Sequence, residues 1–419
     1  MTIALTNTVG GRKETFEPME PGKVSMYHCG PTVKESINIG KFRSYVFADL
    51  LRRYLEYSGY EVFQVMNITD VGHLNEFEED TVEVAAGRTG MTAVELAEKE
   101  EAVFHEDRRA LHIRDAHKYP RAREHIGDMI RLVEDLEQKG VTYRAGGNIY
   151  FDIEKAPRLG SLGAALDDRA SPRQVGGPPH PEKRHPLDID LWRTDALHQL
   201  HWPSPWGLGF PGWHTECVAM SLKYLGGSFD IHTGTSENIF PHHECEIAQA
   251  ETLSGKPLAR WWLHTGPVLV DGKPMTRENQ NVLTAHKLLE AGFRGSVIRV
   301  ALLSGPYRQP LQFGEEAMAA ARGKVNLFLA FREHLETLVP PAGSAVAEVE
   351  ADCTPESCAA WIQATESRFR AALDDDLGYG AALDAVVAGL QTLGPKTIGD
   401  PSQALEALRR WDMVLGIVA

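Results

Sequence analysis

The spacing of apolar residues changes several times in the first part of the chain, and each change predicts an element. A short apolar run over 23–27 predicts a buried strand, and apolar residues recur at helical spacing over 43–58, before Gly59. The apolar run over 61–69 predicts a second strand. A strand, a loop, a helix and a strand in this order form the βαβ unit of a parallel sheet, so the pattern indicates an α/β fold.

The middle of the chain alternates between regular and irregular stretches. Helical spacing predicts helices over 93–111, 121–139 and 213–225, and the run 228–232 then predicts a strand. Proline and glycine are dense over 165–211, which favours loops with few regular elements.

After Glu315 the pattern is helical almost to the end, in about four segments. We therefore expect a helical C-terminal domain. The polar break near 340–355 is the best candidate for a linker.

Composition narrows the class of protein. The 419 residues are 43% apolar and 24% charged, which is ordinary for a soluble globular chain of two or three domains. We expect neither a membrane span nor a secretory signal, because no long apolar run and no basic leader is present. A net charge of −15 disfavours a nonspecific polyanion binder. Five cysteines are too few for a disulfide framework, which favours a cytoplasmic protein.

A glycine-containing loop follows the first predicted strand and leads into the first helix. Gly30 and Thr32 stand at its start, and Asn38, Gly40 and Lys41 at its end. Glycine here lets the backbone approach a phosphate, and the N-terminus of the next helix favours an anion. Because any such turn can contain glycine, a purely structural turn is the commoner meaning of this segment by itself.

A second group consists of residue types that bind zinc well. Cys29 follows the first strand, and Cys217 lies on the helix predicted over 213–225. His242 and Glu246 are four residues apart, so on a helix they share one face. Thiolate, imidazole and carboxylate all coordinate zinc. From spacing alone, a buried thiol and an ordinary helix histidine remain the more frequent interpretation.

A third group lies in the polar segment 272–281. Lys273 and Arg277 could clamp phosphates there. Such a loop is more often simply solvated.

Seven stretches together carry a resemblance. They are YHCGPTV at 27–33, NITD at 67–70, DLW at 190–192, PSPWG at 203–207, GWHTEC at 212–217, FPHHECEIAQ at 240–249 and LLSGPYR at 302–308. In this order they resemble the cysteinyl-tRNA synthetases, a family of class I aminoacyl-tRNA synthetases. They also resemble the shorter cysteine ligase of mycothiol biosynthesis.

The resemblance implies a domain organisation. We expect a Rossmann-type class I catalytic domain over 1–313, with an inserted connective region at about 100–211. A helical bundle domain over 314–419 would follow. We expect no anticodon-binding module, which the short ligase also lacks.

The resemblance also implies a zinc site that reads the substrate. The four ligands of the family fall on Cys29, Cys217, His242 and Glu246. A substrate cysteine can offer its thiolate to the metal, whereas serine cannot, so the metal supplies the discrimination.

Neighbouring residues receive smaller roles. Thr69 and Trp213 match positions that line the amino-acid pocket in the family. His28 could line the pocket too, although a packing role is equally plausible. We expect His243 and Glu244 to be solvated or to support the ligands.

The nucleotide half departs from the family pattern at three places. The family's His-Ile-Gly-Asn or His-Ile-Gly-His signature is Asn38-Ile39-Gly40-Lys41 here. Its Lys-Met-Ser-Lys-Ser loop falls on 274–278, which includes Met275, Thr276 and Arg277. Its Gly-Gly-Ser-Asp stretch runs here from Gly234 to Glu237.

Two interpretations of these changes stay open. Lys41, Arg277 and Lys273 could still stabilise the phosphate charge that builds on ATP, which binds with Mg²⁺, as a carboxylate attacks the α-phosphorus. Asn38 could then donate a hydrogen bond, and Glu237 could accept one from the ribose. Alternatively, Glu278 repels the triphosphate, and adenylation is weakened or lost.

Three functions follow. The first is a zinc- and ATP-dependent ligase that activates L-cysteine as an adenylate and joins it to an unknown amine acceptor. The acidic charge and the missing anticodon module argue against tRNA as that acceptor. The second is a truncated synthetase that charges tRNA. The third is a zinc-dependent cysteine- or thiol-binding protein that has lost adenylation.

Overall fold

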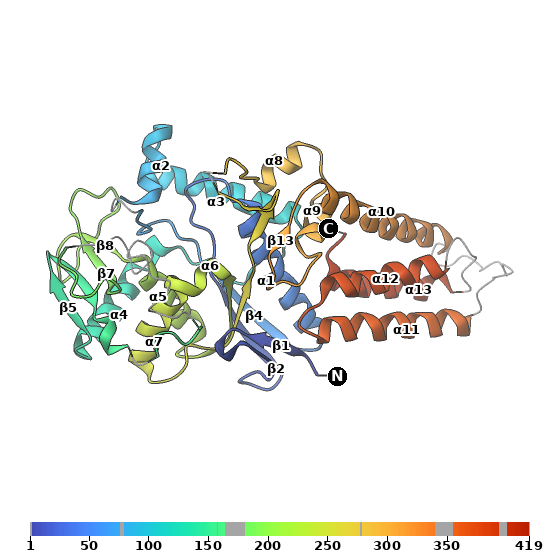
Figure 1. Cartoon of the computed structure of the whole chain (residues 1–419), viewed down its shortest axis with the longest axis horizontal. Helices are drawn as coiled ribbons and strands as arrows, with labels where there is room; N and C mark the ends of the chain where they lie inside the picture. Colours follow the sequence, from blue (N-terminus) through green and yellow to red (C-terminus); the bar gives the residue numbers. More distant parts are fainter. Residues whose placement is uncertain are drawn as a thin grey trace.

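The computed structural model has a parallel sheet at its centre, an antiparallel sheet at one end and long helices at the other (Figure 1). The structure describes residues 2–75, 79–156, 158–163, 181–276, 279–339, 355–393 and 400–418. Buried apolar side chains form two clusters. One joins the central sheet to the helical end, and the other joins it to the antiparallel sheet.

The central sheet has four parallel strands in the order β10-β9-β3-β4. Their bounds are Lys23–His28 for β3, Glu61–Met66 for β4, Phe229–Thr235 for β9 and Ala259–Thr265 for β10. Helix α1 (Ile39–Tyr57) joins β3 to β4, which confirms the predicted βαβ unit and the α/β class. The helix begins earlier than the pattern predicted because Asn38 caps it, its side chain accepting a hydrogen bond from the Lys41 backbone N–H at 2.9 Å.

The chain order reverses in the middle of this sheet. Strands β3 and β9 lie next to each other in the middle. Strand β4, which follows β3 in the chain, lies at one edge of the sheet, and β10, which follows β9, lies at the other edge. Ligands of open α/β sheets bind at the carboxyl ends of the strands at such a reversal. In the register of β3 and β9, His28 lies opposite Thr233. The residues that follow these two strands therefore open the candidate site.

Between β4 and helix α5 (Trp213–Leu225) the chain builds three helices and an antiparallel sheet of order β5-β6-β7-β8. The helices are α2 (Thr81–Thr89), α3 (Ala93–Ala110) and α4 (Ile126–Gln138). The strands are β5 (Thr142–Ala145), β6 (Asn148–Phe151), β7 (Ile189–Thr194) and β8 (Gly209–Pro211).

Two predictions over this region need correction. The helix predicted over 121–139 begins only at Ile126, after a short 3₁₀ turn at Ala122–Glu124. The expectation of loops over 165–211 is wrong for β7 and β8, where Trp192 and Phe210 are buried. Strand β7 forms by pairing with distant β6, and β8 forms by pairing with β7, and such pairing leaves no local pattern to recognise.

The remaining elements before residue 314 are small. They are β1 (Ala4–Asn7), β2 (Arg12–Thr15), α6 (Ser236–Asn238), the turn η5 (Ile239–His243), α7 (Glu244–Ser254), β11 (Val268–Val270), β12 (Lys273–Pro274), α8 (Ala285–Glu290), α9 (Gly295–Leu302) and β13 (Leu311–Gln312). The sheet β12-β11-β13 carries the start of the segment 272–281 beside the central sheet.

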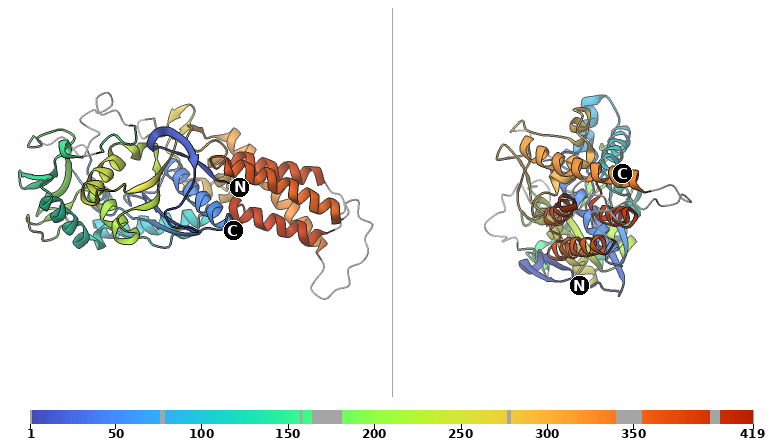
Figure 2. Two further views of the ribbon diagram at one scale, coloured as in Figure 1. Left: turned by 90° about the horizontal axis from the view of Figure 1, so that it is seen from below. Right: turned by 90° about the vertical axis from the view of Figure 1, so that its right-hand side faces the viewer.

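Four helices form the C-terminal end, as the pattern predicted. They are α10 (Glu315–Leu338), α11 (Pro355–Asp374), α12 (Tyr379–Leu393) and α13 (Pro401–Leu415), and Figure 2 shows them running alongside one another. The Tyr54 hydroxyl of α1 donates to Asp374 Oδ1 at 2.6 Å, which ties the bundle to the half that contains the parallel sheet. The expected linker near 340–355 falls almost wholly outside the described residues.

Within the described part of the chain, none of the helices has both the length and the apolar character that crossing a membrane requires.

Candidate active site

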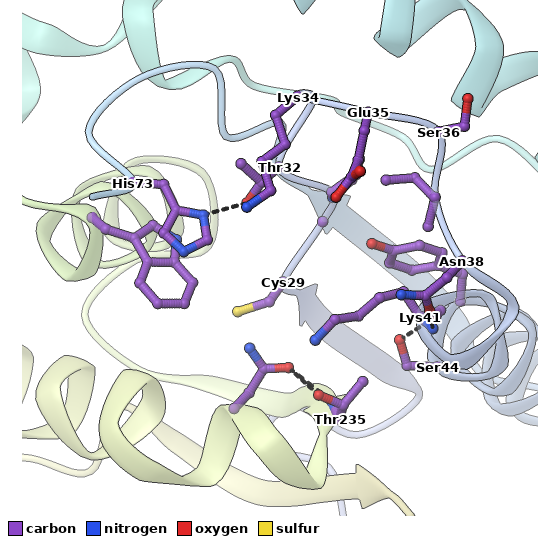
Figure 3. Close-up of a pocket in the computed structure, with 16 residues that line it drawn as sticks. Cys29, Thr32, Lys34, Glu35, Ser36, Asn38, Lys41, Ser44, His73 and Thr235 are labelled. Atoms are coloured by element: carbon purple, nitrogen blue, oxygen red, sulfur yellow. Dashed lines mark hydrogen bonds between the residues drawn. The ribbon is translucent and has the colours of Figure 1, made fainter. Parts of the chain in front are cut away.

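A cavity of about 280 Å³ opens at the carboxyl ends of β3 and β9 (Figure 3). The loop after β3 forms one wall with Cys29, Gly30 and Thr32. The first turn of α1 supplies Lys41 and its cap supplies Asn38, both on the side of Cys29 away from His73. The sequence therefore identified six of its lining residues, which are Cys29, Gly30, Thr32, Asn38, Lys41 and Trp213. His73, Lys34 and Thr235 also line it and were not predicted.

A smaller cavity of about 120 Å³ shares Asn38 and Lys41 with the first. Its other walls come from the segment 266–268 and from the three segments in which the chain departs from the family pattern, where the predicted residues are Gly40, Glu237, Met275 and Thr276. The two cavities are therefore neighbours that share walls, one reaching Cys29 and the other reaching the segment around Thr276.

Two predicted nucleotide residues lie elsewhere. Lys273 is exposed on β12 and is not among the described residues that line either cavity. Gly234 is not among the described residues that line either cavity, and a Cβ there would come within 2.8 Å of His243 Cε1, so its small size lets η5 pack against β9. Arg277 and Glu278 fall outside the described residues.

Lys41 and Glu237 form an ion pair at the junction of the cavities. Lys41 Nζ lies 2.9 Å from Glu237 Oε2, and the ammonium holds the pKa of Glu237 below its ordinary value. Both side chains remain substantially exposed to solvent. The pair therefore presents one cation and one carboxylate to whatever enters the cavities.

Behind Cys29 lies a buried cluster of four potential metal ligands. The atoms offered by Cys29, Cys217, His242 and Glu246 all lie within 4.8 Å of one another. The two sulfurs are 3.9 Å apart, Cys29 Sγ is 3.6 Å from Glu246 Oε1, and that oxygen is 2.9 Å from His242 Nε2. The sequence named these four residues although they come from three separate segments, with His242 and Glu246 sharing one of them.

The electrostatics of the cluster favour a cation. Burial is the largest single influence on Cys217 and works against its thiolate, but a hydrogen bond from Cys29 together with the charge and hydrogen bond of His242 lowers the pKa of Cys217 to about 6. Burial likewise works against protonated His242, yet the charges of Glu246 and Cys217 and their hydrogen bonds together raise its pKa to about 10. A site that draws a proton onto a buried imidazole in this way also suits a positively charged metal ion.

A second set of ligand atoms shares two residues with the first. It combines Cys29 and Glu246 with His232 and His243. His232 Nε2 lies 2.8 Å from Glu246 Oε2, and His243 Nε2 lies 3.2 Å from Cys29 Sγ. These two histidines were not predicted as ligands, because their positions on β9 and η5 converge only through the packing of those elements.

The expectation that His243 and Glu244 could be solvated is wrong. Both are fully buried, because the first two turns of α7 and the preceding turn η5 sit in the core beside α5. His243 Nδ1 lies 2.7 Å from His264 Nε2. Glu244 accepts hydrogen bonds from the backbone N–H groups of Gly160 and Leu162, both at 2.7 Å. They support the site from behind.

Thr69 and His28 lie behind the cavity wall. The Thr69 hydroxyl accepts a hydrogen bond from Asn67 Nδ2 at 3.1 Å, and the residue is 2% exposed. His28 Nδ1 lies 2.5 Å from Thr233 Oγ1, and burial lowers the pKa of His28 to about 3. Neither is among the described residues that line the cavity, so the packing role weighed for His28 fits the geometry.

Trp213 lies between two imidazole rings. Its ring stacks on His242 at a centroid distance of 4.1 Å and on His73 at 4.2 Å. The first contact joins Trp213 to the ligand cluster. The second contact could not be predicted from the sequence, because only the tertiary structure brings His73 and Trp213 together.

Comparison with known proteins identifies the family to which the chain belongs. Residues 15–323 match the family described as tRNA synthetases class I (C) catalytic domain. A cysteine–tRNA ligase of Pelotomaculum thermopropionicum is 39% identical over 428 residues, covering 99% of this chain and 85% of that protein. One from Caldicellulosiruptor saccharolyticus is 40% identical over 381 residues, covering 91% of this chain and 78% of that protein.

Solved structures agree on the fold. Methionyl-tRNA synthetase of Mycobacterium tuberculosis, bound by methionyl-adenylate, gives a TM-score of 0.60 at 15% identity, covering 94% of this chain and 90% of that one. A LeuRS–tRNA–LeuAMS ternary complex from Agrobacterium radiobacter gives 0.64 at 14% identity, covering 96% of this chain and 84% of that one. At these identities the likeness concerns the fold alone.

Proposed function

Because the chain belongs to the class I cysteinyl-tRNA synthetase family of ATP-dependent ligases, we propose that it activates L-cysteine with ATP and transfers the cysteinyl group to tRNA. The observation that carries this proposal is the pair of adjoining cavities, one bordered by Cys29 of the buried thiolate–imidazole cluster and both bordered by Lys41, with Glu237 in the second. The first suits a thiol-bearing amino acid, and the second suits a phosphorylated nucleotide.

The acceptor differs from the one that the sequence first suggested. The relatives reported above are named cysteine–tRNA ligases, and this chain covers most of their length. That supports tRNA over a small amine, despite the acidic charge of the chain.

We assign zinc to Cys29, Cys217, His242 and Glu246. Zn–S bonds of about 2.3 Å in a tetrahedral site place two sulfurs about 3.8 Å apart, close to the spacing of Cys29 and Cys217. This set contains both thiols, whereas the set with His232 and His243 has one. Bound here, zinc would supply a Lewis acid for the substrate thiolate.

The protein's own residues orient this metal centre. His214 Nδ1 lies 2.8 Å from His242 Nδ1, which leaves Nε2 of His242 directed to the cluster. Trp213 covers the other side of that imidazole and, at the cavity wall, bounds the space for the amino acid.

Adenylation requires charge stabilisation on the nucleotide side. A carboxylate oxygen of cysteine attacks the α-phosphorus of ATP, and pyrophosphate leaves. Lys41 would stabilise the developing phosphate charge with the Mg²⁺ that accompanies ATP, and Arg277 would assist from the segment 272–281. Asn38 could donate a hydrogen bond to a phosphate, and Glu237 could accept one from a ribose hydroxyl. A hydroxyl of the tRNA then attacks the adenylate carbonyl and releases AMP.

The test is cysteine-dependent ATP–pyrophosphate exchange on zinc-loaded protein, followed by transfer from radiolabelled cysteine. Serine and a reaction without amino acid are the controls. Exchange with cysteine and label on tRNA would support the proposal. Exchange with label only on an amine such as glucosaminyl-inositol would reject the tRNA acceptor, and bound cysteine without exchange would reject adenylation.

A further inference from the structure

We propose that His73 positions Trp213 at the amino-acid end of the cavity and thereby sets the affinity and selectivity for cysteine. This inference rests on the proposed function, because it concerns the same amino-acid pocket. His73 belongs to none of the stretches that carry the resemblance, and it approaches the site from the loop after β4.

The geometry is a stack of three nearly parallel rings. The His73 and Trp213 planes meet at 19°, and the Trp213 and His242 planes at 22°. Trp213 is the first residue of α5. The residue before it is Gly212, which has no side chain with which to cap the helix. The indole at the cavity wall is therefore held between an imidazole of the ligand cluster and the imidazole of His73.

Close packing and hydrogen bonds hold the backbone around His73 in place. Gly72 has φ +77°, and a Cβ there would lie 2.6 Å from the Pro211 carbonyl oxygen and 2.7 Å from Glu216 Oε1. The Gly72 N–H donates to Asp80 Oδ2 at 2.7 Å, and the His73 carbonyl accepts from the Thr81 N–H at 2.9 Å. The loop is thus fixed both to the segment before α5 and to the start of α2.

The His73 side chain is held at both its face and its edge. Its Nδ1 lies 3.1 Å from Thr32 Oγ1, the neighbouring side chain in the cavity wall, as Figure 3 shows. Burial, reinforced by the nearby charge of Lys34, lowers the pKa of His73 to about 3. A neutral ring therefore faces the indole throughout the physiological pH range.

Loss of His73 would free one face of the indole without disturbing the ligand cluster. His242 keeps its contacts with Glu246 at 2.9 Å and with His214 at 2.8 Å. The effect should therefore fall on cysteine binding and not on zinc binding. A stacked aromatic pair contributes enough to change an affinity by roughly three- to tenfold.

The experiment compares His73→Ala, His73→Phe and His73→Asn in the full-length, zinc-loaded protein. His73→Phe keeps a flat ring and loses the contact with Thr32, whereas His73→Asn keeps a polar group and loses the ring. His334→Ala, on an exposed face of α10, is the matched control. The readouts are zinc content, KM for cysteine and for ATP in the exchange reaction, and the ratio of cysteine to homocysteine turnover.

We expect His73→Ala to raise KM for cysteine by roughly three- to tenfold. It should also lower the preference over homocysteine, with KM for ATP and zinc content unchanged. His73→Phe should restore KM, and His73→Asn should not. Unchanged KM in His73→Ala, restoration by His73→Asn alone, or loss of zinc would overturn the inference.

Calorimetric binding of cysteine separates this inference from the proposed function. If the unmodified protein binds cysteine but shows no exchange, adenylation fails, and the same variants still test the stack by their dissociation constants. If the unmodified protein does not bind cysteine at all, both proposals are overturned.

Discussion

Replacing Lys41 with methionine should strongly lower kcat/KM for ATP while leaving the fold intact. The side chain lines both cavities and reaches Glu237 at 2.9 Å. The backbone of Lys41 is fixed independently, because its N–H is capped by Asn38. Methionine keeps much of the length of the side chain and removes only its charge and its hydrogen bonds.

The magnitude follows from exposure. The Lys41 and Glu237 side chains are 39% and 71% exposed, so their pair should contribute less than about 1 kcal/mol to stability. A hydrogen bond from the ammonium to a phosphate is worth about 1.5–3 kcal/mol, which corresponds to a loss of about 10- to 150-fold in kcat/KM for ATP. KM for cysteine should remain near its original value.

The assay is pyrophosphate exchange at varied ATP and saturating cysteine, with thermal unfolding measured in parallel. Lys324→Met is the matched control, because Lys324 pairs with Asp384 at similar exposure on the distant helical bundle. A loss of threefold or less in kcat/KM for ATP would show that Lys41 does not serve the phosphates. So would an equal loss in the control.

The other predictions concern the metal and the core. Cys217→Ser should lower the zinc content and the affinity for cysteine together, and metal analysis that finds full zinc occupancy would contradict the ligand assignment. Arg299→Met removes a buried guanidinium that lies 2.7 Å from Asp49 Oδ2 and donates to the Leu415 carbonyl, so it should cost about 3–5 kcal/mol in urea unfolding; a loss below about 1 kcal/mol would refute this. Burial would raise the pKa of Asp49, but Arg299 and its arginine neighbours bring it below the ordinary value. The Asp49 carboxylate therefore contributes to the free energy of unfolding above the ordinary pKa of an aspartate. This contribution is lost as pH falls through the lower pKa of Asp49 in the folded protein, so Asp49→Asn should flatten the acid limb of a plot of stability against pH.

Local periodicity is why much of the architecture could be predicted. The strand β3, the helix α1 and the strand β4 each bury a face that the spacing of their own apolar residues defines. The same holds for the four C-terminal helices. The strands β7 and β8 were missed because their stability comes from pairing across the antiparallel sheet, not from an alternation within each segment.

The amino-acid sequence alone fixed which residue types were available for the site, and through resemblance it named Cys29, Cys217 and two further residues as candidate zinc ligands. Only the tertiary structure brought the sulfurs of Cys29 and Cys217 to 3.9 Å across 188 positions of chain. It also decided that Gly234 serves packing and that His73 stacks on Trp213. The reason is physical: periodicity records what each segment buries, whereas contacts between segments depend on how the sheet and its helices close around a common core.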